Sequence, residues 1–336
     1  MMAESPQTLL ELRGVSKRFV KSLDVAARIA NVFGAGAKEE VVHAVDEVDL
    51  TIQRGEVVGL VGESGCGKST LGRMAVGLHS LSAGTRLWKG EEIDKFEPAL
   101  RRKKQLGIQM IFQDPYASLN PRMRVLDIVG EAPVAHKLIT AREQAGYVEG
   151  LLQRVGLDPA VLRRFPHQFS GGQRARVGIA RALAVQPEFL VCDEAVAALD
   201  VSIQAQVLNL FIQLRDELNL TYLFISHDLG VVRHLSDRVV IMYLGRVVES
   251  APADAVFTRA NHPYTQALLA SAPKLETRKT EFFAVKGEIP SPLNPPPGCH
   301  FHPRCPHAMP RCSLEKPALR EVAPSHFSAC HLNDQT

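Results

Sequence analysis

The stretch "GESGCGKST", residues 62–70, follows a short apolar run and precedes the helix-like segment "TLGRMAVGL". It fits the phosphate-binding pattern G-x-x-x-x-G-K-S/T in the strand–turn–helix context that the pattern requires. Glycines let the backbone curl so that successive N–H groups point at an anion, and the helix N-terminus adds partial positive charge. We therefore expect a nucleotide site that contains Gly62, Glu63, Ser64, Gly65, Cys66, Gly67, Lys68, Ser69 and Thr70.

Two side chains of this loop have a predicted task. Lys68 would reach the β- and γ-phosphates, and the hydroxyl of Ser69 would bind Mg²⁺. Cys66 occupies a variable position of the pattern, so its thiol has no predicted chemical role. The turn alone thus predicts a nucleoside triphosphate with Mg²⁺ as its ligand.

Two further apolar runs resemble buried parallel strands. They are "EFLVCDE" (188–194), which ends on two carboxylates, and "TYLFISHD" (221–228), which ends near a histidine. Continuous apolar runs are typical of strands that are covered on both faces, and ligands of open α/β sheets lie beyond the carboxyl ends of such strands. An amphipathic crossover helix between the two runs is indicated by Val207, Leu210, Phe211, Leu214 and Leu218.

The two carboxylates at the end of the first run complete the predicted site. Asp193 would hold Mg²⁺, directly or through water, and Glu194 would polarise an attacking water molecule. Acids at a strand end often only cap the following helix, which is the alternative interpretation. Together with the phosphate loop, however, the pair indicates nucleotide hydrolysis.

Composition narrows the class of protein. The 336 residues carry 39 basic and 36 acidic side chains, a balance that gives no electrostatic footprint for nucleic acid. The densest basic run, "RRKK" at 101–104, is expected to be a solvated face. The N-terminus has no signal-peptide pattern, and no apolar stretch approaches the roughly 20 residues that span a bilayer. We expect a cytosolic chain that other chains bring to any membrane, and thiols that are kept reduced.

The distribution of residue types along the chain predicts two domains. Alternating patterns in "LLELRGVSKRF" and "EVVHAVDEVDLTI" indicate a β-rich start, interrupted by a loop-like insertion at residues 20–40. Residues 115–180 indicate a mostly helical insert. Beyond about residue 260 the composition shifts to Pro, His and Cys. The prediction is a nucleotide-binding domain at 1–260, with a helical subdomain at about 115–180, and an irregular C-terminal appendage at 261–336.

Five ordered motifs extend this interpretation. "FSGGQRARVGIARAL" (169–183) lies shortly before the Asp193–Glu194 pair, and the chain also contains "IFQDP" with Gln113, "AALD" ending at Asp200 and "FISHDL" with His227. In these motifs the chain resembles the ABC-type ATPases over nearly its whole length. The resemblance implies an α/β P-loop NTPase fold with a parallel-sheet core, an N-terminal antiparallel β subdomain and a helical subdomain.

The resemblance also implies a composite site. The signature residues Ser170, Gly171, Gly172 and Gln173 open a helix, and in ABC proteins this anion site faces the γ-phosphate on the opposing subunit. Asp200 would cross the dimer interface and His227 would contact the γ-phosphate. Gln113 would contact nucleotide and Mg²⁺ and couple the site to a transmembrane partner. The implied catalytic set is Glu194, His227, Lys68 and Gln113.

Two further points of the resemblance concern the aromatic residue that stacks on adenine and the positions that depart from the family pattern. The aromatic side chain that stacks on adenine matches Phe19 best, and the insertion that follows leaves Phe33 open. The chain departs from the family pattern at Gln168, Phe169, Ala195 and Ala198. None of these changes removes a group that the chemistry needs, so an active site is expected.

Three stretches resemble the ATPase subunits of oligopeptide, dipeptide and nickel importers. They are "QDPYASLNPRMRV", "HPYTQALLASAP" and "GEIPSPLNPPPGCHFHPRCP". This implies a heterodimer with a sister ATPase, two permease chains, an external peptide-binding protein and a peripheral location at the cytoplasmic face of the inner membrane. The alternatives are a soluble ABC ATPase acting on ribosomes or DNA, a regulatory scaffold, and an importer of nickel chelates or glutathione.

Four of the six cysteines lie in the appendage, at Cys299, Cys305, Cys312 and Cys330. Four thiolates can hold Zn²⁺ or an iron–sulfur cluster, and the gaps between these cysteines do not choose between them. The resemblance to peptide-importer ATPases implies a structural 4Fe–4S cluster, with Zn²⁺ as the alternative. The nearby histidines, expected to be bystanders, are His300, His302, His307 and His331.

Overall fold

The computed structural model describes residues 7–21, 39–114, 117–271 and 287–335. Its centre is an eight-stranded sheet with the strand order β11-β12-β10-β9-β3-β8-β7-β6. The inner strands β9, β3, β8, β7 and β6 are mutually parallel, and β10, β12 and β11 continue the sheet antiparallel. The parallel strands are β3 (Val57–Val61), β6 (Ile108–Ile111), β7 (Phe189–Asp193), β8 (Thr221–Ile225) and β9 (Arg238–Tyr243).

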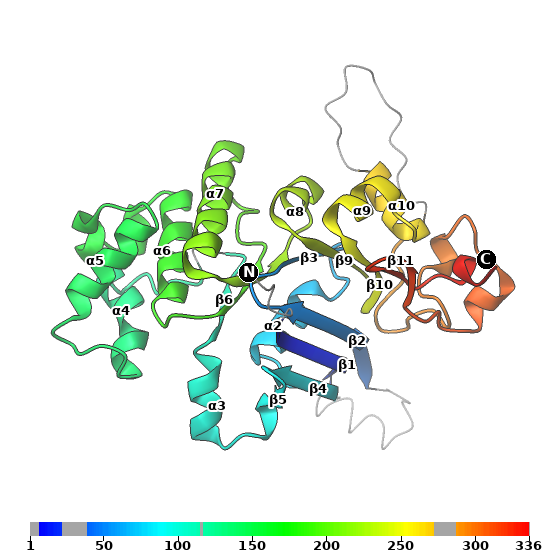
Figure 1. Cartoon of the computed structure of the whole chain (residues 1–336), viewed down its shortest axis with the longest axis horizontal. Helices are drawn as coiled ribbons and strands as arrows, with labels where there is room; N and C mark the ends of the chain where they lie inside the picture. Colours follow the sequence, from blue (N-terminus) through cyan, green and yellow to red (C-terminus); the bar gives the residue numbers. More distant parts are fainter. Residues whose placement is uncertain (1–6, 22–38, 115–116, 272–286, 336) are drawn as a thin grey trace, which may run out of the picture.

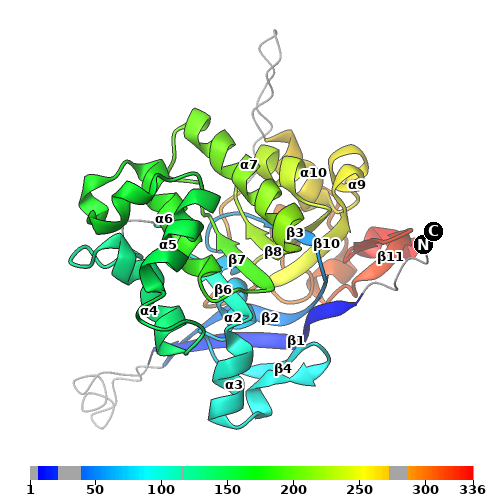
Figure 2. The same ribbon diagram turned by 60° about the vertical axis from the view of Figure 1, so that its left-hand side comes forward.

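A second, antiparallel sheet covers one face of the first. Its order is β2-β1-β4-β5, formed by β1 (Thr8–Lys21), β2 (Glu40–Gln53), β4 (Ala83–Trp88) and β5 (Glu91–Glu92). Helix α2 (Lys68–Val76) lies between the two sheets and shares one apolar core with both of them. Figure 2 shows this layer on one side of the central strands and helices α7 to α10 on the other.

The helical subdomain lies at one end of the molecule, drawn in green in Figure 1. It contains α4 (Val125–Ala135), α5 (Gln144–Arg154), two 3₁₀ turns (Pro159–Arg163 and Pro166–Gln168) and α6 (Gly171–Leu183). Its apolar side chains form one core with α7 (Val201–Leu218), the crossover helix that the apolar spacing predicts. Helix α3 (Pro98–Gln105), which carries the RRKK run, buries none of its residues, in agreement with a solvated face.

The C-terminal part packs on the opposite end of the sheet (Figure 1). It follows α8 (Leu229–Leu235), β10 (Arg246–Pro252), α9 (Ala253–Arg259) and α10 (Pro263–Ala270). Beyond residue 287 it is mostly irregular, with three short 3₁₀ turns (His302–Arg304, Pro310–Ser313 and His331–Gln335). The expectation of an irregular appendage needs one correction, because β11 (Arg320–Ala323) and β12 (His326–Ser328) form a hairpin that extends the main sheet through β10.

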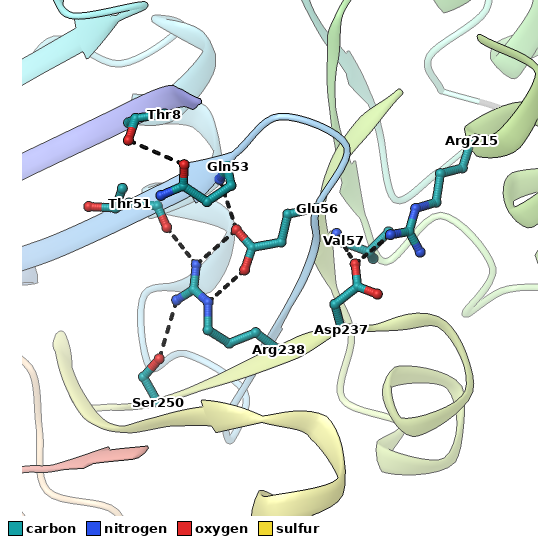
Figure 3. Close-up of polar contacts among 9 residues, drawn as sticks. All are labelled: Thr8, Thr51, Gln53, Glu56, Val57, Arg215, Asp237, Arg238 and Ser250. Atoms are coloured by element: carbon teal, nitrogen blue, oxygen red, sulfur yellow. Dashed lines mark hydrogen bonds and ion pairs between the residues drawn. The ribbon is translucent and has the colours of Figure 1, made fainter. Parts of the chain in front are cut away.

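Polar contacts fix the end of β3 that lies away from the phosphate loop (Figure 3). The Arg238 guanidinium, at the start of β9, donates to Glu56 at 2.7 and 3.2 Å and to the hydroxyl of Ser250 at 3.3 Å. Asp237 accepts from the backbone N–H of Val57 at 2.8 Å and from Arg215 at 2.7 Å. These contacts tie the turn between β2 and β3 to β9, β10 and α7, so the strand that carries the loop is anchored at its base.

Because the inner strands are parallel, their carboxyl ends meet at one edge of the sheet. The phosphate loop follows β3 there, Asp193 ends β7, and Gln113 and His227 follow β6 and β8. This common edge brings the separate sequence motifs together. Among the helices within the described ranges, none is both long and apolar enough to cross a membrane.

Candidate nucleotide-binding site

The phosphate loop needs glycine at two positions for different reasons. A Cβ at Gly62 would lie 2.1 Å from the carbonyl oxygen of Met242 in β9. Gly67, which precedes α2, has a φ of 104°, and a Cβ there would lie 2.1 Å from the carbonyl oxygen of Ala44. The loop is therefore pressed between β9 and β2, a packing that only glycine at both positions allows.

Lys68 is the first residue of α2 and its side chain folds back over the loop. Its Nζ donates to the carbonyl oxygens of Gly62 at 2.7 Å and Glu63 at 3.0 Å. The residue is 5% exposed. A buried ammonium group needs oxygen partners of this kind, and the oxygens of a bound phosphate would meet the same need.

Ser69 and Asp193 meet across the gap between α2 and β7. The Ser69 hydroxyl donates to the Asp193 carboxylate at 2.7 Å. Burial raises the pKa of Asp193, while the hydrogen bond from Ser69 acts in the opposite direction. A hydroxyl and a carboxylate oxygen in contact are the hard donors that Mg²⁺ prefers, so these residues fit the ion.

The Glu194 carboxylate lies close to the two other predicted polar residues of the site, Gln113 and His227. Its Oε2 accepts from Gln113 Nε2 at 2.8 Å and lies 3.5 Å from His227 Nδ1. Its backbone has a φ of 48°, a left-handed conformation that costs energy in a side chain of this size and that clusters at functional sites. The carboxylate is only 16% exposed, whereas the His227 side chain is 61% exposed.

Lys68, Ser69, Gln113, Glu194 and His227 line one cavity of about 610 Å³, and Asp193 lies behind Ser69, outside its lining. Phe19 also lines this cavity. The residue is 38% exposed, and its ring is in edge contact with His79. Phe33, the alternative stacking residue, lies outside the described residues, as does most of the insertion at 20–40. The cavity is lined by Phe19, Val42, Ala44, Ser64, Gly65, Gly67, Lys68, Ser69, Thr70, Gln113, Glu194, His227 and Pro292.

The signature motif does not line this cavity. Ser170 caps α6, because its Oγ accepts from the Gln173 N–H at 3.3 Å and Gln173 Oε1 accepts from the Ser170 N–H at 3.1 Å. A Cβ at Gly172 would lie 2.4 Å from Ile203, so this glycine permits α6 to approach α7. Asp200 precedes α7 and makes no side-chain cap. Ser170, Gly171 and Asp200 are exposed.

Comparisons with known proteins agree with this geometry. The family model described as ABC transporter matches residues 45–197, and the model of the oligopeptide/dipeptide transporter C-terminal region matches residues 248–312. The oligopeptide transport ATP-binding protein AppF of Bacillus subtilis is 51% identical, over 99% of both chains. This chain belongs to the ATP-binding subunits of oligopeptide/dipeptide ABC transporters. The putative oligopeptide transport ATP-binding protein YkfD of the same organism is 50% identical, over 89% of this chain and 92% of that one.

Solved ABC ATPase structures share the fold. A post-hydrolysis dimer of the ATP-binding cassette MJ0796 with ADP and phosphate has a TM-score of 0.61 at 26% identity, covering 73% of this chain and 99% of that one. The cbiO1 subunit of Clostridium perfringens has a TM-score of 0.62 at 27% identity, with 75% and 92% covered. The predicted fold class, the ATPase activity and the class of peptide-transporter subunit are confirmed. ATPases of this class bind ATP and Mg²⁺ and work with membrane permease subunits.

The prediction of a metal centre on the four late cysteines is wrong. Cys299, Cys305, Cys312 and Cys330 do line one cavity, but its volume is about 10 Å³, the room that one water molecule needs. Among the described residues, no group of three or more His, Cys, Asp or Glu side chains could hold a metal ion. AppF, too, is named as an oligopeptide transport ATP-binding protein, without mention of a metal centre. Neither a 4Fe–4S cluster nor Zn²⁺ is supported.

The environment of the thiols gives the physical reason. Burial raises the pKa of Cys299 to about 11 and raises the pKa values of Cys305 and Cys330 as well. Cys299 and Cys305 pack against the apolar cluster that contains Tyr264 and Phe301. Cys299 and Cys305 thus act as small apolar side chains.

Sequence reasoning missed three residues near the site. Pro292 lines the cavity, and its carbonyl oxygen accepts from the His43 N–H at 3.0 Å. Arg304 and Tyr264 contact the phosphate loop at Glu63. All three belong to the C-terminal part, and no local pattern links their segments to residue 63. The one sequence feature that could have indicated a fixed position for this part of the chain is the Pro-rich stretch "GEIPSPLNPPPG", because proline restricts the backbone.

Asp193→Asn is expected to stabilise the nucleotide-free protein while weakening its use of Mg²⁺. Since the native pKa of Asp193 is raised, its contribution to stability is present when it is protonated and is lost as pH rises through that pKa. Asparagine removes this cost, and we expect the unfolding free energy at pH 8 to rise by about 0.5–2 kcal/mol. The gain should shrink as the pH is lowered.

Urea unfolding without Mg²⁺ between pH 5 and 8 measures this effect, with Asp216→Asn on the exposed side of α7 as a control. ADP titrations with and without Mg²⁺ measure how much the ion strengthens ADP binding. In the variant, Mg²⁺ should no longer strengthen ADP binding. A variant that is less stable than the wild type at pH 8, or that keeps the full Mg²⁺ effect, would contradict the expectation.

Proposed function

We propose that the 610 Å³ cavity is one half of an ATP site, in which each predicted residue has a specific task. The loop N–H groups and Lys68 would bind the phosphates, and Phe19 would stack on adenine. Ser69, Asp193 and Gln113 would hold Mg²⁺, which when bound offsets the negative charge on the phosphate oxygens. The support comes from the Ser69–Asp193 contact of 2.7 Å and from the one cavity that Phe19, Lys68, Ser69, Gln113, Glu194 and His227 line together.

Glu194 would direct the water that attacks the γ-phosphorus. The bond from the water oxygen to phosphorus forms as the bond to the β–γ bridging oxygen breaks, and the proton of the water passes to the Glu194 carboxylate or to phosphate oxygen. The products are ADP and inorganic phosphate. Gln113 at 2.8 Å and His227 at 3.5 Å orient the carboxylate, and His227 would contact the γ-phosphate.

We propose that a second ATPase chain completes the site. The observation that carries this proposal is that Ser170, Gly171, Gly172 and Asp200 do not line the cavity that the loop and Glu194 line. Ser170 and Gly171 are exposed at the N-terminus of a 13-residue helix, which presents free N–H groups and partial positive charge to an anion outside this subunit. Each chain would then supply a loop to one ATP and a signature helix to the other.

The proposal extends to the partner chains, the membrane location and the cargo of the transporter. The partner would be a sister ATPase, so that the pair is a heterodimer. It would sit peripherally at the cytoplasmic face of the inner membrane, below two permease chains that an external peptide-binding protein supplies with cargo. The relatives AppF and YkfD are named for oligopeptide transport, which favours peptides over nickel chelates or glutathione as the cargo. We also propose the division of the chain at about residue 260.

Purification and reconstitution test this proposal. The chain co-expressed with a candidate sister ATPase should form a one-to-one pair, by light scattering, when ATP is added without Mg²⁺. With the permeases in vesicles that contain ATP and Mg²⁺, uptake of a labelled tripeptide should exceed uptake of labelled glutathione or a nickel chelate. Dimers of this chain alone at equal affinity would contradict the heterodimer. Faster uptake of either competitor would contradict the cargo.

A further inference from the structure

Glu63, the second residue of the phosphate loop, is held by an arginine 241 residues further along the chain. The Arg304 guanidinium donates to both oxygens of the Glu63 carboxylate, at 2.8 and 3.1 Å. Arg304 lies in the 3₁₀ turn His302–Arg304 of the C-terminal part, and its side chain is 5% exposed. Two parallel N–H···O bonds from a buried guanidinium fix both the position and the plane of the carboxylate.

The backbone of the same loop residue is held by a second side chain. The N–H of Glu63 donates to the hydroxyl oxygen of Tyr264 at 2.9 Å. Tyr264, in the first turn of α10, is fully buried, and its ring packs against Tyr243 and Phe301 with centroid distances of 4.6 and 5.4 Å. A hydroxyl on a ring so enclosed has little freedom to move, so it is a fixed acceptor.

The third polar group of Glu63 faces the catalytic side of the loop. Its carbonyl oxygen accepts from Lys68 Nζ at 3.0 Å and from the N–H of Cys66 at 3.3 Å. One residue thus connects the C-terminal part, through its carboxylate and N–H, with the lysine that is proposed to bind phosphate. The pKa of Arg304 is raised, first by its hydrogen bonds to Glu63, so the guanidinium stays charged at every working pH.

We infer that Arg304 and Tyr264 are positioning residues of the ATP site, and that the C-terminal part holds the phosphate loop in the shape that binds nucleotide. The inference rests on the proposed phosphate-binding role of the loop and of Lys68. Glu63 itself does not line the cavity, because its carboxylate is turned onto Arg304. Without Arg304 this carboxylate is unpaired beside the place where phosphate charge must enter, and like charges there oppose binding.

Equilibrium binding of Mg²⁺·ADP to the purified full chain tests the inference, because ADP needs no hydrolysis and only this chain's own loop. Arg304→Met is expected to weaken ADP binding about tenfold, and Arg304→Lys, which keeps the charge but loses the two-bond geometry, to weaken it less. Tyr264→Phe should also weaken it, since the Glu63 N–H then has no acceptor. Arg311→Met is the matched control, because Arg311 pairs with Glu315 and Asp334 at the exposed surface of the same region.

A double-mutant cycle separates positioning from a general loss of structure. If Arg304 acts through Glu63, then Glu63→Gln combined with Arg304→Met should weaken ADP binding no more than Arg304→Met alone. Thermal unfolding of each variant shows whether it is folded, and should Arg304→Met not fold, Glu63→Gln and Arg304→Lys give the same comparison. Wild-type ADP affinity in a folded Arg304→Met protein, or additive losses in the cycle, would overturn the inference.

The same titrations distinguish this inference from the proposed function. Lys68→Ala should weaken ADP binding whether or not Arg304 has a positioning role. If Lys68→Ala binds ADP as well as the wild type does, the proposed role of the loop fails. If Lys68→Ala loses affinity and Arg304→Met does not, only the positioning role fails.

Discussion

Replacing Glu194 with Gln is expected to lower kcat for ATP hydrolysis about 10³-fold and to leave ADP affinity within about twofold of the wild type. The amide has the size of the carboxylate and can still accept the hydrogen bond that Gln113 donates at 2.8 Å. It has neither the charge nor the basicity to take a proton from water. The loss should therefore fall on the chemical step and not on nucleotide binding.

A second glutamate close in sequence to Glu194 provides a matched control. Glu188, just before β7, pairs with Arg54 and Lys89 on the side of the sheet away from the cavity. Glu188→Gln should leave kcat unchanged. Both variants should be compared by phosphate release in the assembled transporter, with the sister chain's own ATP site inactivated by substitution. A Glu194→Gln protein that hydrolyses ATP within tenfold of the wild-type rate would show that another group activates the water.

The fold and most of the site could be predicted because each motif is local and the parallel sheet collects them. The loop at 62–70, the Asp193–Glu194 pair, Gln113 and His227 each follow a strand of the same sheet. Once the strands are known to be parallel, their carboxyl ends must share an edge. The contacts of 2.7 Å between Ser69 and Asp193 and of 2.8 Å between Gln113 and Glu194 follow from that topology.

Contacts between distant segments could not be predicted in this way. Arg304 and Glu63 are 241 residues apart, and neither segment contains a periodicity or a motif that indicates a contact with the other. The prediction of a metal centre on the cysteines failed for a related reason, because the number and clustering of the cysteines say nothing about the size of the cavity that they line. A volume of about 10 Å³ is a property of packing, which the linear sequence does not contain.

Ser170→Asp is expected to lower the rate of ATP hydrolysis by the assembled pair about 10²-fold without destabilising this chain. Ser170 is the N-cap of α6, and aspartate is an equally good or better cap whose charge also suits the helix N-terminus. If the exposed signature helix meets the γ-phosphate bound by the other subunit, the new carboxylate faces phosphate across the interface. Repulsion between these charges should keep the two chains from closing on ATP.

Ser170→Asn is the control that isolates charge from shape, since asparagine caps helices as well as serine and is neutral. It should retain considerably more activity than Ser170→Asp, with an equal melting temperature. ADP binding to the isolated chain should be the same in both variants and in the wild type, because the Ser170 side chain does not line the chain's own cavity. If Ser170→Asp weakens ADP binding to the isolated chain, the signature helix serves the site of its own subunit and the two-chain site must be abandoned. Loss of activity only after pairing would instead place Ser170 opposite the nucleotide of the partner.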